Sequence, residues 1–186
     1  EEYKIYQKRQ KLKESRVLKF LTEHIGKPDT YDKVVDSDCG KDSGQRPDIV
    51  YDCKIHIVIV EIDENQHSSN CTLGEQNRLR NVYFSYEGTP VFVIRYNPDN
   101  FYSHGKKVVI PIEKREDILL RWVKKARNDI TKFPLSIVYL FYNGYTETTK
   151  NFQELDPYRI DCFQCDCGDI FYVDCIYKEH ILTCFK

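Results

Sequence analysis

Hydrophobic and polar residues recur at two different spacings along the chain, and the spacing predicts where helices and strands lie. Over residues 3–25, apolar residues recur every three or four positions among Lys and Glu, which is typical of an amphipathic helix. The segment 26–28, Gly-Lys-Pro, is expected to end this helix. Two more helices are predicted, one over 75–87 and one within 111–130.

Short apolar runs that are rich in β-branched residues predict strands. The strongest run is 55–63, in which residues 57–60 are all Ile or Val, as in strands that are buried on both faces at the centre of a sheet. The other predicted strands cover 31–35, 48–53, 90–96 and 135–142. This order of helices and strands predicts a mixed α/β fold, with a small sheet flanked by helices.

Composition and length narrow the class of protein. A chain of 186 residues has room for one domain and a small appendix, and we expect a core over 1–150 followed by a linker and a Cys-rich module over 151–186. Hydrophobic residues make up 41% of the chain, which excludes extended disorder. No apolar run is long enough to cross a bilayer, and no signal peptide is visible. We therefore expect an intracellular protein that is not secreted and does not enter a membrane.

The formal net charge of −1 excludes a polycation that coats nucleic acid over its whole surface. Two stretches, 1–23 and 113–132, each carry seven basic and four acidic residues. Such stretches are more often solvated helix faces than binding patches, so neither by itself indicates a nucleic-acid site.

Acidic residues cluster around the central predicted strand. Glu61 and Asp63 alternate along it and therefore point to the same side. If 48–53 pairs with 55–63 as a tight hairpin, Asp48 lies beside them, with His67 a few residues beyond. Crowded carboxylates repel one another unless a cation lies between them, and oxygen ligands favour Mg²⁺ or Mn²⁺. The sequence therefore predicts a metal site with Asp48, Glu61 and Asp63 as ligands, and with His67 as base or proton shuttle.

The segments Pro47–Tyr51 and Glu61–Asp63 resemble the PD-(D/E)XK nuclease superfamily, in which a Pro-Asp strand and an acid-bearing strand hold a metal. The third position of that pattern is normally Lys and is Asp63 here. The chain is most similar to endonucleases of the very-short-patch-repair type and to related homing endonucleases of the EDxHD type. Those proteins carry a His at the place of His67 and an acid on the first helix, at the place of Glu14. The likeness covers about residues 12–100.

The resemblance implies a restriction-endonuclease-like fold and a metal-dependent endonuclease of double-stranded DNA. It implies that Asp48 ligates the metal and that His67 is the general base. Glu14 would hold a water or orient His67, and Glu61 or Asp63 would complete the site.

Further residues are candidates for binding the substrate. In the resemblance, basic residues on the helix and strand after the active site face phosphate, which points to Arg78 and Arg80. Because the usual Lys is missing, stabilisation of the transition-state charge falls to Arg78, Arg80, Lys54 or Gln66. The alternative is that the arginines are ordinary surface charges and that Gln66 shapes the loop, in which case these side chains have no role in catalysis.

The last 25 residues hold five of the eight cysteines and resemble a small zinc finger. Twelve residues separate Cys167 from His180, and three separate His180 from Cys184, which is the spacing of a hairpin followed by a helix. The fourth ligand is Cys162 or Cys165, with Cys162 favoured because a Cys-x-Cys pair strains the turn. We expect structural Zn²⁺ there, since so short a segment has too little core to fold unaided.

Two other functions remain open from the sequence. One is a nuclease-like module that has lost catalysis and binds DNA or protein through the finger, which the missing Lys favours. The other is an RNA nuclease or a structure-specific resolvase. The oligomeric state does not follow from the sequence.

Overall fold

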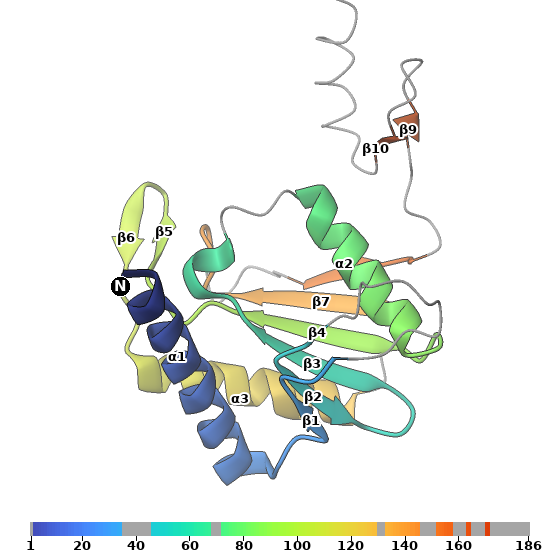
Figure 1. Cartoon of the computed structure of the whole chain (residues 1–186), viewed down its shortest axis with the longest axis horizontal. Helices are drawn as coiled ribbons and strands as arrows, with labels where there is room; N and C mark the ends of the chain where they lie inside the picture. Colours follow the sequence, from blue (N-terminus) through green and yellow to red (C-terminus); the bar gives the residue numbers. More distant parts are fainter. Residues whose placement is uncertain are drawn as a thin grey trace, which may run out of the picture.

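The computed structural model (Figure 1) describes residues 2–34, 46–67, 72–129, 133–145, 152–157, 163–164 and 170–171. Of these, the side chains of 2–10, 65, 67, 72–77, 153, 163–164 and 170–171 are not described. No helix in this part of the chain is both long enough and apolar enough to cross a membrane.

The predicted helices and the predicted central strands are present. The helices are α1 (Glu2–Ile25), α2 (Thr72–Ser85) and α3 (Ile112–Asn128), with a short 3-10 helix η1 (Glu64–His67). The main sheet contains β1 (Thr30–Tyr31), β2 (Ile49–Asp52), β3 (Ile57–Ile62), β4 (Val91–Tyr96), β7 (Leu135–Leu140) and β8 (Phe152–Leu155). Two small antiparallel pairs are β5 (Phe101–Ser103) with β6 (Lys106–Val108), and β9 (Phe163–Gln164) with β10 (Ile170–Phe171).

The main sheet is mixed, with the strand order β1-β2-β3-β4-β7-β8. β3, β4 and β7 are parallel, and the other pairs are antiparallel. The expected hairpin of β2 and β3 is confirmed, with Ile49 opposite Val60 and Asp52 opposite Ile57. The expectation of a mixed α/β fold is therefore correct.

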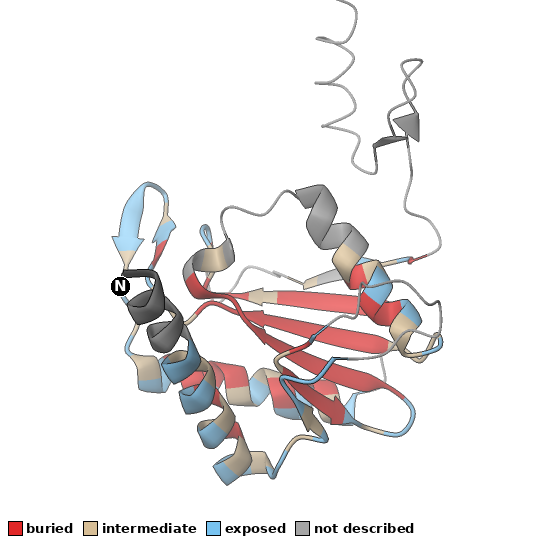
Figure 2. Ribbon diagram, in the orientation of Figure 1, coloured by how far each residue is buried: buried red, intermediate tan, exposed pale blue. Residues whose placement is uncertain are grey.

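Helices cover both faces of the sheet, and β3 is buried between them (Figures 1 and 2). Successive side chains of a strand point to opposite faces of the sheet. Val58 and Val60 therefore pack in the hydrophobic cluster that also contains buried residues of α1 and α3. Ile57 and Ile59 pack instead in the cluster that contains α2. The prediction that this strand lies inside the sheet and is buried on both faces is confirmed.

Glycine ends the first helix, as the sequence predicts. Gly26 has φ +90°, a left-handed conformation that glycine adopts without a steric penalty, and its N–H donates to the carbonyl of Thr22 at 3.1 Å. α1 then delivers Val17 and Leu21, both fully buried, to the core. This fixes the position of the preceding turn of α1, which carries Glu14.

Two local predictions were wrong, and one element was not predicted. The start of the segment 151–186, which we predicted to be a linker, contains β8, which pairs with β7 along the edge of the main sheet. The hairpin of β5 and β6 was not predicted, and the strand predicted over 31–35 is only Thr30–Tyr31. Strands of two to four residues are too short for their alternation to stand out in the sequence.

Candidate functional site

The acidic residues gather where β3 ends, at the edge where the neighbouring parallel strands β4 and β7 also end. Ligands in open α/β sheets commonly bind outside the carboxyl ends of the parallel strands. Glu61 is the fifth residue of β3, and Asp63 follows its last residue. The hairpin register places Asp48, one residue before β2, opposite Glu61. The sequence-based prediction that these residues come together at one end of the strands is therefore correct.

Asp48 is half-buried and its carboxylate has a defined position. Its Oδ2 accepts the backbone N–H of Ile62 at 2.7 Å, so one oxygen is fixed to the end of β3. The nearby guanidinium of Arg46 binds Asp32, through Nη2 to Oδ2 at 2.9 Å. The Asp48 carboxylate thus lies among other acids, while this cation is engaged by a different carboxylate.

This environment raises the pKa of Asp48 from 3.8 to about 8. Burial is the largest cause, and the negative charge of Glu61 is the second. Glu14 and Asp63 add to the rise, and the hydrogen bond from Ile62 opposes it. A carboxyl group in this state is stabilised by gaining either a proton or a metal cation.

Glu61 is buried, with 5% of its surface exposed, and a residue of α2 binds its carboxylate. Arg78 Nη2 donates to Glu61 Oε2 at 2.8 Å. Burial raises the pKa of Glu61, although the charge and hydrogen bond of Arg78 oppose the rise. Arg78 therefore compensates part of the negative charge on β3, and one oxygen of Glu61 is engaged in doing so.

Asp63 forms a buried ion pair. It is 1% exposed, and Arg95 on β4 binds both of its oxygens, through Nε at 2.6 Å and Nη2 at 2.8 Å. The hydroxyl of Tyr142 also donates to Asp63 Oδ2 at 2.5 Å. These contacts occupy Asp63 with an internal network that joins the ends of β3, β4 and β7.

The predicted three-carboxylate cage is not formed. In the part of the chain that the structure describes, no three His, Cys, Asp or Glu side chains are placed to hold one metal ion. Asp63, which we expected as a ligand, is instead bound by Arg95 and Tyr142. Asp48 and Glu61 remain together on neighbouring strands, and their charges interact.

Glu14 lies on the side of the site that α1 forms, as expected. It is half-buried, and its pKa is raised by burial first and by the charge of Asp32 second. Its charge in turn raises the pKa of Asp48. Helix α1, packed on the sheet through its core residues, therefore brings a third acid near the start of β2.

Sequence reasoning missed Glu64. It is 5% exposed, and its Oε1 has no hydrogen-bond partner within the described residues. Burial raises its pKa, and the charge of Glu14 adds to the rise. The signal in the sequence was its position, directly after Asp63 at the end of a buried strand.

Gln66 and His67 belong to η1, which follows the acidic end of β3. Gln66 has φ +61° and exchanges two hydrogen bonds with Asn143, from Nε2 to Oδ1 at 3.0 Å and from the Asn143 N–H to Oε1 at 2.8 Å. Gln66 therefore shapes the loop, and its role in binding the substrate stays a prediction. The imidazole of His67 lies outside what the structure describes, so its predicted role as base stays a prediction.

Arg78 and Arg80 differ in position. The side chain of Arg78 reaches Glu61. Residues two apart on a helix point in different directions, so Arg80 leaves α2 on another side. Arg78 is therefore placed beside an acid of the site.

The predicted zinc ligands lie outside the described residues. They are Cys162, Cys165, Cys167, His180 and Cys184. The short antiparallel pair of β9 and β10 brackets residues 165–169. The zinc site remains a prediction from the spacing of the cysteines.

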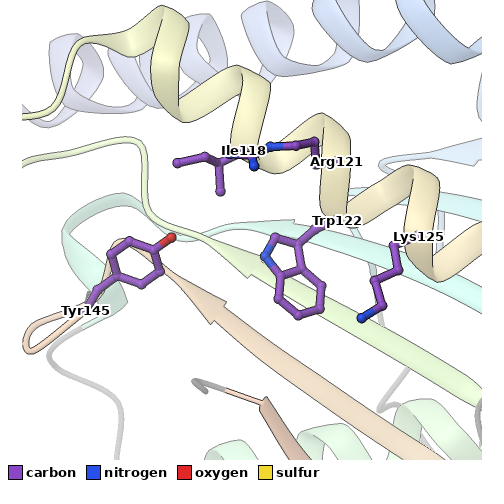
Figure 3. A pocket seen from close by; sticks show the side chains of 5 residues that line it. All are labelled: Ile118, Arg121, Trp122, Lys125 and Tyr145. Atoms are coloured by element: carbon purple, nitrogen blue, oxygen red, sulfur yellow. The ribbon is translucent and has the colours of Figure 1, made fainter. Parts of the chain in front are cut away.

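A surface hollow of about 170 Å³ lies on the opposite side of the sheet from α2 (Figure 3). Four of its lining residues come from α3, and Tyr145 lines it from beyond the end of β7. Lys125 Nζ lies 5.4 Å from the centre of the Trp122 ring. Among the predicted site residues whose side chains the structure describes, none lines this hollow.

No family model, no curated protein and no solved structure matches this chain.

Proposed function

We propose that the protein is a metal-dependent endonuclease that hydrolyses phosphodiester bonds in DNA. The observation that carries the proposal is the state of Asp48, whose pKa is raised to about 8 by burial and by Glu61. Strong perturbation of this kind at a sheet edge is typical of functional sites. The order of Glu14 on α1, Asp48 before β2 and Glu61 on β3 is also the order that the nuclease resemblance requires.

The donor atoms fit a hard divalent cation. Mg²⁺ is usually bound by only one or two carboxylates, and it keeps several waters or takes oxygens of a substrate phosphate. Asp48 and Glu61 supply two such carboxylates on neighbouring strands, so a third protein ligand is not needed. When bound, the ion would neutralise their repulsion, polarise the phosphate and lower the pKa of an attacking water.

The other residues of the site would transfer protons, offset charge on the phosphate and hold the strands in place. Glu14 and Glu64 have pKa values that burial raises above the usual range of a glutamate, so they bind a proton more readily than exposed glutamates do and are candidates for proton transfer. Arg78 is the cation beside Glu61 and would offset charge that builds up on the phosphate, in place of the missing Lys. The Asp63–Arg95 pair would hold the ends of β3 and β4 in register. By the resemblance, His67 would act as the general base.

A module that has lost catalysis is the second candidate. The observation that favours it is the ion pair between Arg78 and Glu61, at 2.8 Å, which satisfies part of the acidic charge without a metal. In this alternative the protein binds DNA or another protein through the Cys-rich finger, and the core does not cut. The Cys-rich tail would bind structural Zn²⁺ under either function.

A plasmid cleavage assay separates the two functions. Supercoiled DNA is incubated with the full chain and Mg²⁺ or Mn²⁺, beside the variant Asp48→Asn. The endonuclease predicts nicked or linear product from the wild type and a loss of at least about 100-fold in the variant, since removing one charge-stabilising group costs this much or more. Absence of cleavage in both metals, or equal cleavage by the variant, would leave the binding module. The same assay with single-stranded RNA and with a branched DNA substrate tests the other nuclease classes.

A further inference from the structure

The hairpin of β5 and β6 projects from the core at the end of the sheet where η1 lies (Figure 1). Its two-residue turn is His104-Gly105, with φ +50° and +74°. Positive φ at both turn residues matches the right-handed twist of the flanking strands, so the turn is a stable one for a short hairpin. An isolated two-stranded hairpin is at best marginally stable, so its base must be fixed by the core.

The base of the hairpin is fixed firmly. Phe101 is 1% exposed and packs against Phe141 and Tyr145, with ring centres 6.3 and 5.9 Å away. The loop just before it is held by the buried Arg115, which donates to the carbonyl of Asp99. Lys13 on α1 also binds the Asp99 carboxylate at 2.6 Å. The core therefore presents the hairpin as a defined projection.

The projecting part carries positive charge and an aromatic ring. Lys106, Lys107 and His104 are exposed, and the ring of Tyr102 is 54% exposed. No acidic residue occurs between Phe101 and Pro111. Tyr102 is opposite Lys107 and Ser103 is opposite Lys106, so the two lysines lie on opposite faces of the ribbon.

We propose that this hairpin enters a groove of double-stranded DNA tip-first and that Lys106 and Lys107 bind phosphates on the two walls. The proposal rests on the proposed function, because it takes DNA as the partner. The major groove is about 12 Å wide and admits a two-stranded ribbon. One cation on each face fits a groove whose walls are two phosphate strands, and lysine contacts to phosphate position a protein on the duplex.

The hairpin is also tied to the loop that follows the acidic site. Asn143 Oδ1 accepts the backbone N–H of Tyr102 at 2.8 Å and the side-chain amide of Gln66 at 3.0 Å. The Asn143 N–H donates back to Gln66, and the Gly144 N–H donates to the carbonyl of Tyr102. A duplex held by the hairpin is thus held in a fixed position relative to η1 and the end of β3.

Fluorescence anisotropy with a labelled 20-base-pair duplex tests the proposal. Every protein carries Asp48→Asn and the buffer contains Ca²⁺, so that binding is measured without cleavage. The test variant adds Lys106→Ala and Lys107→Ala. The control instead adds Lys124→Ala and Lys125→Ala, which change two exposed lysines of α3. These lysines lie at the other end of the sheet, because the carbonyl of the neighbouring Ala126 is hydrogen-bonded to the ring of His56, just before β3 begins. Thermal unfolding checks that all three proteins fold.

We expect the hairpin variant to bind roughly ten-fold more weakly at 0.15 M salt. The slope of log affinity against log salt should fall in magnitude by about 1.8, which is the loss of two phosphate contacts, while the control keeps its slope. Equal slopes for the hairpin variant and its parent would overturn the proposal, as would a parent that does not bind duplex DNA. If the hairpin variant binds more weakly as expected but the wild-type chain cleaves no plasmid DNA, the proposed activity is refuted and the hairpin proposal stands.

Discussion

Replacing Asp48 by Asn should make the metal-free protein more stable above pH 8, although it removes a side chain of the candidate site. In the folded state the pKa of Asp48 is about 8, against 3.8 as the reference value, because burial and Glu61 disfavour its charge. The folded chain therefore holds this proton more tightly than the unfolded chain does. The contribution of Asp48 to the free energy of unfolding therefore falls as pH rises from about 4 to about 8, and stays low above that.

The size of the effect follows from the same values. The difference between 3.8 and about 8 corresponds to at most about 6 kcal/mol, at about 1.4 kcal/mol for each tenfold change in proton affinity. Asp48 is only half-buried, so solvent screening reduces this limit, and we expect about 2 kcal/mol. Asn stays neutral, and its amide oxygen can still accept the N–H of Ile62. The variant should match the wild type at pH 4 and exceed it by about 2 kcal/mol at pH 9.

Urea unfolding at pH 4, 6.5 and 9, in buffer with a chelator of divalent metals, measures this difference. The matched control is Asp63→Asn, the same chemical change two positions beyond Glu61. It breaks the buried pair with Arg95 and should destabilise the fold by about 3–5 kcal/mol at neutral pH. A variant Asp48→Asn that is less stable than the wild type at pH 9 would refute the reasoning, because Asp48 would then stabilise the fold in its charged form.

Four further predictions test the core, the buried network, the loop and the tail. Leu119→Ala should cost about 2–5 kcal/mol in urea unfolding, because Leu119 is fully buried in the core, and a cost under 1 kcal/mol would contradict that placement. Tyr142→Phe should cost about 1–2 kcal/mol through the lost hydrogen bond to Asp63, and an unchanged midpoint would speak against this bond. Gln66→Ala should lower the rate of plasmid cleavage ten-fold or more with little loss of stability, since it frees η1, and full activity would show that the loop needs no anchor. Cys184→Ser should remove zinc from the purified protein as measured by plasma mass spectrometry, whereas a metal content equal to the wild type would exclude Cys184 as a ligand.

The main sheet could be predicted because its central strands have a strong local signal. The unbroken run Ile57–Val60 is buried on both faces by α1, α3 and α2, as such runs usually are. The tight hairpin with β2 then follows from the short turn between them, and it places Asp48 opposite Glu61. The local sequence therefore determines the acidic pair.

The ion pair of Asp63 could not be predicted, because its partner is distant in the sequence. Arg95 lies 32 positions away in the sequence and meets Asp63 only because β3 and β4 are parallel and in register. The alternation of Glu61 and Asp63 indicates the shared side of the strand but not which cations lie there. The burial of Glu64 likewise depends on the tertiary structure, since the same letters after another strand would form a solvated turn.

The β5–β6 hairpin shows a different limit of the sequence. Each strand has only three residues, and Phe101 is the one fully buried residue of the six, so no apolar alternation marks them. Its position is set by the burial of Phe101 and by the hydrogen bonds of Asn143, which are contacts between distant segments.

A crystal soaked with Mn²⁺ tests the central claim most directly, because anomalous scattering locates the metal without reference to activity. Our account predicts a peak beside the Asp48 and Glu61 carboxylates, within about 2.2 Å of an oxygen of Asp48, and no such peak in Asp48→Asn. A soaked crystal with no metal at this edge, and with Glu61 still bound only by Arg78, would contradict the account.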